Sequence, residues 1–131
     1  MLYPAARPIP GFEWKQGYPA YPSPQPKEGM VLHSAVGPLS VTLSELSKPD
    51  RRASWHFTVA QDGTVYQHYD TGDVCWHCGL IGDADTLSAA IGNVALIGIE
   101  HEGGGPGNYS EPLTEPQYAA TLELNRWLLP S

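Results

Sequence analysis

The chain has 131 residues, 41% of them hydrophobic, which is the length of one domain and enough apolar material for a folded core. Fourteen acidic residues against seven basic ones give a formal net charge of -7. This charge balance disfavours binding to nucleic acid, because contacts to phosphates depend on Lys and Arg. It equally disfavours binding to an anionic membrane surface. Since the sequence shows neither a bilayer-spanning apolar stretch nor a secretion signal at its start, we expect synthesis in the cytoplasm and no membrane partner.

Residues 1–28 hold most of the 13 prolines, interleaved with aromatic residues. Prolines at this density exclude a helix or a central strand, whereas the aromatic side chains favour packing against a core. We predict a proline-rich arm over residues 1–28 that packs on a domain formed by residues 29–131. A free tail is the alternative.

Two apolar runs, residues 29–37 and 94–102, predict strands that are buried on both faces of a sheet. The second run ends in Glu100, His101 and Glu102, followed by three glycines. Ionisable side chains at a sheet end are typical of a functional site, although a strand that runs out into solvent also explains them. His33 interrupts the first run, where a polar side chain is costly unless something binds it.

Helices are expected over residues 39–46, where leucines share one face, and as a short turn over residues 87–91. The last helix begins after Thr114, which can cap it together with Gln117 three residues later, and ends before Pro130.

A β-hairpin is predicted from the alternating segments Trp55–Ala60 and Val65–Tyr69. The Asp62-Gly63 pair between them favours a tight primed turn, which needs a positive φ at both central residues. The order of strands and helices predicts an α/β fold with a mixed central sheet flanked by helices.

Histidine is the commonest metal ligand and the commonest general base near neutral pH. The chain has five candidates, His33, His56, His68, His77 and His101. Cys75 and Cys78 flank His77 and admit three interpretations: a redox pair, half of a zinc site, or small and partly buried residues. We favour the last, because a second ligand pair and the strand-to-helix context of the redox motif are both missing.

Five blocks in order resemble the zinc-dependent N-acetylmuramoyl-L-alanine amidase family, which includes phage lysozyme-type endolysins, bacterial muropeptide amidases and peptidoglycan-recognition proteins. The blocks are Val31-Leu32-His33-Ser34, Ser54-Trp55-His56-Phe57 with Gln61-Asp62-Gly63, Trp76-His77-Cys78-Gly79, Ile97-Gly98-Ile99-Glu100-His101-Glu102-Gly103, and Tyr109 with Gln117. The resemblance covers about residues 29–129 and implies the amidase fold.

The resemblance also implies a zinc cofactor, with His33 as one ligand. In the family, a second histidine, a cysteine or aspartate, and a lysine follow the last helix. The sequence stops before that segment, so the resemblance implies a domain that is incomplete at its C-terminus and lacks two of three ligands.

Some family members use a tyrosine as general base, at the position that Trp55 occupies in this sequence. Others use the glutamate of the Gly-Ile-Glu strand, which falls on Glu100, so the resemblance implies Glu100 as the catalytic base and acid. It further implies that His77 lines the substrate cleft. Trp76, Trp55 and Tyr109 are candidates to contact sugar and stem peptide, or else are core residues.

The function that the resemblance implies is hydrolysis of the amide bond between N-acetylmuramic acid and L-alanine by zinc-activated water, with peptidoglycan as the partner and the bacterial cell wall as the place of action. A peptidoglycan-binding module of the same fold without catalysis, or an inactive fragment, is the alternative.

Overall fold

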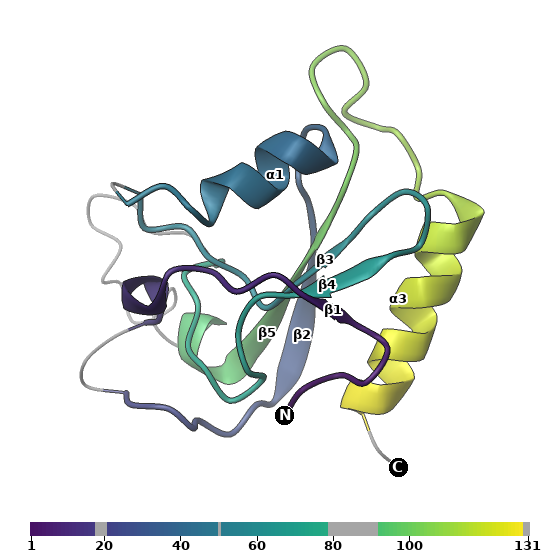
Figure 1. Ribbon diagram of the computed structural model, residues 1–131. Helices are drawn as coiled ribbons and strands as arrows, with labels where there is room; N and C mark the ends of the chain where they lie inside the picture. Colours follow the sequence, from purple (N-terminus) through teal and green to yellow (C-terminus); the bar gives the residue numbers. More distant parts are fainter. Residues whose placement is uncertain (18–20, 50, 79–91, 130–131) are drawn as a thin grey trace.

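The computed structural model describes residues 1–17, 21–49, 51–78 and 92–129 and shows a five-stranded sheet with helices on both sides (Figure 1). The strands are β1 (Arg7–Pro8), β2 (Gly29–Ser34), β3 (Phe57–Val59), β4 (Val65–Gln67) and β5 (Leu96–His101), in the spatial order β1-β4-β3-β5-β2. The helices are α1 (Leu39–Glu45), α3 (Glu115–Leu128) and the 3₁₀ turn η1 (Glu13–Lys15). Among these five strands, β3 and β4 pair antiparallel and the other pairs are parallel, so the predicted mixed α/β sheet is confirmed.

Helix α3 covers one face of the sheet (Figure 1). The core on this face consists of Phe57, Val59, Val65, Ile97, Ile99 and Leu124. Thr114 and Gln117 form the predicted capping box at the start of the helix. The buried Gln117 amide also donates to the carbonyls of Val59 and Glu102, at 3.0 and 2.9 Å. The helix is therefore fixed to the ends of β3 and β5.

No helix among the described residues is long and apolar enough to cross a membrane.

The opposite face of the sheet lies under α1 and the segment that follows β4. On this face Glu100 of β5 is in register with His33 of β2 on one side and with Thr58 of β3 on the other. Residues that are directly opposite in paired strands point to the same face. The sheet therefore places the predicted base and the predicted metal ligand side by side.

Both apolar runs differ in detail from the predicted strands. β2 is an edge strand that ends at Ser34 and is half-buried, with 51% of Leu32 exposed, so the prediction of burial on both faces is wrong there. β5 begins only at Leu96, because residues 92–95 form a helical turn. The helical turn predicted over residues 87–91 lies outside the described residues.

The hairpin is present, but its turn is not the predicted primed turn. Gly63 has a φ of +88°, whereas Asp62 is not in the left-handed region. The N–H of Gly63 donates to the Ala60 carbonyl and the N–H of Ala60 donates to the Thr64 carbonyl, both at 2.9 Å. This is a three-residue loop that needs one left-handed glycine at its end.

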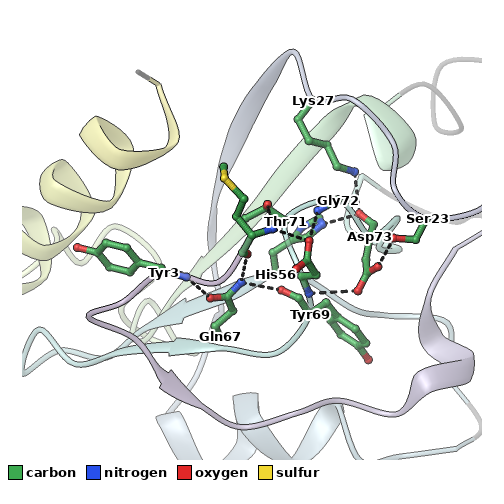
Figure 2. Close-up of polar contacts among 11 residues, drawn as sticks. Tyr3, Ser23, Lys27, His56, Gln67, Tyr69, Thr71, Gly72 and Asp73 are labelled. Carbon is green, nitrogen blue, oxygen red and sulfur yellow. Dashed lines mark hydrogen bonds and ion pairs between the residues drawn. The ribbon is translucent and has the colours of Figure 1, made fainter. Parts of the chain in front are cut away.

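The start of the chain is built into the sheet. β1 lies parallel to β4, at an edge where a proline is tolerated. The fully buried Lys15 donates from Nζ to the carbonyls of Glu45 and Ala53, at 2.5 and 3.2 Å. The Gln67 side chain accepts from the Tyr3 N–H at 2.8 Å (Figure 2). The division of the chain into arm and domain at residue 28 stays a prediction.

Asp73 is the centre of a polar network that fixes the segment after β4 (Figure 2). Its carbonyl accepts from His56 Nε2 at 2.8 Å and from Lys27 Nζ at 2.7 Å. Its carboxylate accepts from the Ser23 hydroxyl at 2.5 Å and from the Asp70 N–H at 3.1 Å. Because all these groups are satisfied, the segment that carries Trp76 and His77 begins from a well-defined position.

Candidate functional site

Glu100 is half-buried on the face of the sheet opposite α3. Burial raises the pKa of its carboxyl to about 7. Among the described residues, none donates a hydrogen bond to this carboxylate. The side chain lines a hollow together with Trp55, Glu45 and Arg51. A carboxyl with these properties can take up and release a proton near neutral pH.

His33 and His77 come together from β2 and from the segment after β4. His33 Nε2 lies 3.1 Å from His77 Nδ1, and the two rings meet edge to face with centroids 5.3 Å apart. His33 is thus held from one side by a second imidazole. Its Nδ1 atom has no hydrogen-bond partner among the described residues.

Gly98 of β5 has no side chain, and the His77 ring occupies the space that a Cβ would fill. A Cβ at Gly98 would lie 2.6 Å from Cγ of the His77 ring, far inside contact distance. The backbone of Gly98 is fixed in turn by the fully buried His56, whose Nδ1 accepts from the Gly98 N–H at 3.0 Å. The sequence makes His56 a candidate metal ligand or general base, whereas the structure gives it this supporting role; Gly98 was not a candidate, and its place in one of the family blocks is the signal that could have indicated it.

The histidines of this cluster are neutral at pH 7. Burial lowers the pKa of His56 to about 3 and that of His77 to about 4. Burial also lowers the pKa of His33. Neutral imidazoles keep one lone pair each, which is the form that accepts hydrogen bonds or binds a metal.

The two polar residues after Glu100 have structural roles. His101 is buried on the α3 side, with Nδ1 at 3.1 Å from the His33 carbonyl and Nε2 at 2.7 Å from the Thr121 hydroxyl. The Glu102 carboxylate accepts from the N–H groups of Leu39 and Gln61, at 3.1 and 2.8 Å. Of the three consecutive polar residues, only Glu100 lines the hollow.

The aromatic candidates lie in different settings. Trp55 is 6% exposed, donates from Nε1 to the Thr58 hydroxyl at 2.8 Å, and lines the same hollow as Glu100. Trp76 is half-buried, and the Arg52 guanidinium lies 5.6 Å from its ring centroid. Tyr109 is 70% exposed and is not among the residues that line the hollow beside Glu100. The structure therefore brings together Trp55 and Glu100, and leaves Tyr109 apart.

The fit to a zinc ion is partial. A protein zinc site takes at least three side-chain ligands, and His33 offers one nitrogen. Cys78 Sγ lies 3.4 Å from His77 Nδ1, and both Cys78 and the fully buried Cys75 are free thiols. In the part of the chain that the structure describes, no group of three or more His, Cys, Asp or Glu side chains is arranged to bind a metal. These residues supply one ligand position and not a complete set.

The structure is a mixed α/β sheet with helices on both sides, and it places Glu100 and His33 side by side on neighbouring strands. The family model described as N-acetylmuramoyl-L-alanine amidase matches residues 23–130. The chain belongs to this family.

Solved structures with the same fold include amidases and endolysins. The amidase LysC from Clostridium intestinale URNW is 21% identical with a TM-score of 0.53; the alignment covers 78% of this chain and 62% of that one. A selenomethionine derivative of AmpD is 18% identical with a TM-score of 0.65, over 97% and 75% of the two chains. A mutant endolysin from Bacillus subtilis is 25% identical with a TM-score of 0.57, over 94% and 75%. None of the curated proteins compared with the chain matches it.

Proposed function

We propose that the chain hydrolyses the amide bond between the lactyl group of N-acetylmuramic acid and L-alanine in peptidoglycan, and so acts on the bacterial cell wall. Family membership supports an amidase. The observation that carries the proposal is Glu100, a half-buried carboxyl whose pKa is raised to about 7 and which stands in register with His33.

Glu100 serves as the proton carrier in this proposal. Its carboxylate accepts a proton from the water that attacks the amide carbon, and then delivers that proton to the leaving nitrogen. The products are the lactyl carboxylate and the free amine of L-alanine, so one water is consumed for each bond broken. His33 would hold a zinc ion through one ring nitrogen; when bound, zinc supplies Lewis-acid polarisation of the amide carbonyl and of water.

The substrate contacts follow from the exposure of the remaining candidates. Tyr109 is 70% exposed and Trp76 is half-buried, whereas Trp55 is only 6% exposed. Flat aromatic surfaces suit the apolar faces of sugars and peptide groups. We assign Trp76 and Tyr109 to binding of peptidoglycan, and Trp55 to the wall of the hollow beside Glu100.

Replacement of the base tests the proposal. Glu100→Gln keeps the size of the side chain and removes its ability to accept a proton, so the release of L-alanine amino groups from purified cell walls should fall at least 100-fold. Glu28→Gln is the matched control, because Glu28 is an exposed carboxylate before β2. If E100Q cleaves walls at the wild-type rate, Glu100 is not the base.

A second candidate function is binding to peptidoglycan without cleavage. It is favoured by one observation, the lack of a complete set of metal ligands among the described residues. A chain with this function would sediment with purified walls and release no amino groups from them, with or without added zinc. Release of amino groups by the wild-type chain would rule it out.

A further inference from the structure

A series of buried hydrogen bonds connects the wall of the hollow beside Glu100 to the start of the sequence. Trp55 Nε1 donates to the Thr58 hydroxyl at 2.8 Å, and the oxygen of that hydroxyl lies 2.7 Å from His68 Nε2. On the other side of the ring, His68 Nδ1 lies 2.7 Å from the Ile9 carbonyl oxygen. Trp55, Thr58 and His68 are 6%, 0% and 5% exposed, so water competes little for these hydrogen bonds.

One assignment of protons satisfies every atom of this series. Burial lowers the pKa of His68 to about 4, so the ring is neutral at pH 7. The Ile9 carbonyl only accepts, so His68 Nδ1 is the donor and Nε2 carries the lone pair. The Thr58 hydroxyl must then donate to Nε2, and its oxygen accepts from the Trp55 indole. Loss of any link would leave a buried polar group without a partner, which is costly.

The Ile9 carbonyl is held in place by the backbone around it. The Ile9 N–H donates to the Gln67 carbonyl at 3.0 Å, and the Gly11 N–H donates to the His68 carbonyl at 3.2 Å. Residues 9–11 therefore run along the backbone that carries His68. They precede residues 23–130, which the family model matches, so this support comes from a part of the chain that the family model does not match.

At its other end, the series fixes two residues beside Glu100. Thr58 of β3 is in register with Glu100 of β5, and Trp55 lines the same hollow as Glu100. The indole also meets the His68 ring edge to face, with centroids 6.4 Å apart and planes at 88°. An indole that is held by a hydrogen bond and by a ring contact keeps a single orientation.

We propose that His68 is a positioning residue, which connects residues 9–11 to Trp55 through Thr58 and so holds the indole as a rigid wall of the hollow beside Glu100. The start of the chain is then a functional part of the site. The effect on catalysis rests on the proposed function, whereas the orientation of the indole does not.

The orientation of the indole is measured by ¹H–¹⁵N spectra of the full chain at pH 7, with the Trp55 indole signal assigned by its loss in Trp55→Phe. We expect this N–H to exchange slowly with D₂O, and the His68 ring to carry its proton on Nδ1. Thr58→Val keeps the shape of the side chain and removes the hydroxyl, so the signal should shift and its exchange should accelerate about 10-fold or more. Thr58→Ser restores the hydroxyl and should return both to the wild-type values.

A variant of His68 tests the next link. His68→Phe keeps an aromatic ring against the indole and removes both ring nitrogens, so it should shift the Trp55 signal as T58V does. Thr121→Val is the matched control, because it removes a hydroxyl that lies 2.7 Å from Nε2 of the buried His101 on the other face of the sheet. The control should leave the Trp55 signal unchanged.

Hydrolysis of a defined N-acetylmuramoyl peptide supplies the second readout. A displaced wall disturbs the geometry beside Glu100, so kcat of T58V and H68F should fall about 10-fold. KM should change less than about twofold, because the substrate contacts assigned to Trp76 and Tyr109 lie outside the series. T58S and T121V should keep kcat close to the wild-type value.

The outcomes separate the inference from the proposed function. Fast exchange of the wild-type indole N–H, a proton on Nε2 of His68, or an unchanged Trp55 signal in both T58V and H68F would overturn the inference, and the wild-type spectra decide this even if T58V does not fold. The expected spectra together with a wild-type chain that hydrolyses no substrate would refute the proposed function and leave the positioning of Trp55 standing. An active wild type whose kcat is retained by both variants would refute the catalytic part of the inference.

Discussion

Among single residues, Glu100 has a raised pKa that suits proton transfer but lowers the stability of the folded protein. The pKa of its carboxyl rises from 4.5 in the unfolded chain to about 7 in the folded protein, because burial penalises the charged form. The folded state therefore holds this proton more tightly, and ionisation of Glu100 lowers stability progressively as the pH rises from 4.5 through 7. The difference amounts to at most about 3 kcal/mol above pH 8.

Glu100→Gln should therefore stabilise the metal-free protein at pH 8, by about 1 to 3 kcal/mol, since it removes a half-buried charge. The gain should shrink as the pH approaches 4.5, where the carboxyl is protonated in the folded state. Urea unfolding at pH 8 and pH 5 measures both values, with the exposed Glu28→Gln as control. A destabilised E100Q at pH 8 would show that the carboxylate makes favourable contacts that the structure does not contain.

At the scale of elements, the connection from β2 to α1 contains a strained residue. Val36 has a φ of +57°, a region that β-branched residues rarely adopt. It leads into Gly37, whose N–H and carbonyl pair with those of Gly103 at 3.2 and 3.0 Å. The pairing fixes the loop after β5 against the end of β2, so the strain helps to shape the edge of the sheet where His33 lies.

Val36→Gly should relieve this strain and raise the free energy of unfolding by about 0.5 to 1 kcal/mol, after the entropic cost of glycine is subtracted. Val41→Gly is the control, because Val41 is an exposed valine inside α1 and its replacement should lower stability by about 0.5 kcal/mol. Thermal unfolding of both variants at one pH compares them. A V36G protein that is less stable than wild type would contradict the assignment of strain.

At the scale of the whole molecule, buried histidines govern stability in acid. Burial lowers the pKa of His56 to about 3, and that of His68 and His77 to about 4. These groups stay neutral in the folded protein but bind protons in the unfolded chain below pH 6.5. The contribution of these neutral histidines to the free energy of unfolding is therefore fully present above pH 6.5 and is lost as the pH falls towards 4.

Glu100 opposes this trend, because it holds one extra proton in the folded state between pH 4.5 and 7. The unfolded chain therefore takes up about two more protons than the folded protein around pH 5 to 6. As the pH is lowered through this range, the free energy of unfolding should fall by about 2.7 kcal/mol per pH unit. Urea titrations at pH 5, 5.5 and 6 measure the slope, and a flat profile would contradict the protonation states assigned to the three histidines.

The positions of the strands and the cap of the last helix can be predicted from the sequence, because both depend on local patterns. The capping box of Thr114 and Gln117 and the strand before Glu100 are determined by neighbouring residues. The prediction that β2 is buried on both faces is wrong, because an apolar run does not distinguish an edge strand from a central one. The turn at Gly63 was misassigned, since a dipeptide does not reveal the length of its loop.

The residues of the candidate site also differ in how far they can be predicted from the sequence. Glu100 and His33 are marked in the sequence by their places in apolar runs, and the family resemblance implies their roles, whereas their pairing in register is seen only in the structure. The contact of His77 with His33 joins segments 44 residues apart, and the space above Gly98 exists only once the strands have paired. The separate roles of Glu100, His101 and Glu102 likewise depend on partners from α1, α3 and the hairpin.

The proposed cleavage of the lactyl amide, with Glu100 as proton carrier, can be followed by mass spectrometry of a defined N-acetylmuramoyl peptide that is incubated with the zinc-supplemented chain in H₂¹⁸O. We expect one ¹⁸O atom in the lactyl carboxylate, an L-alanine peptide with a free amine and no ¹⁸O, and neither product with E100Q. An uncleaved substrate with the wild-type chain, or the same labelled products with E100Q, would contradict it.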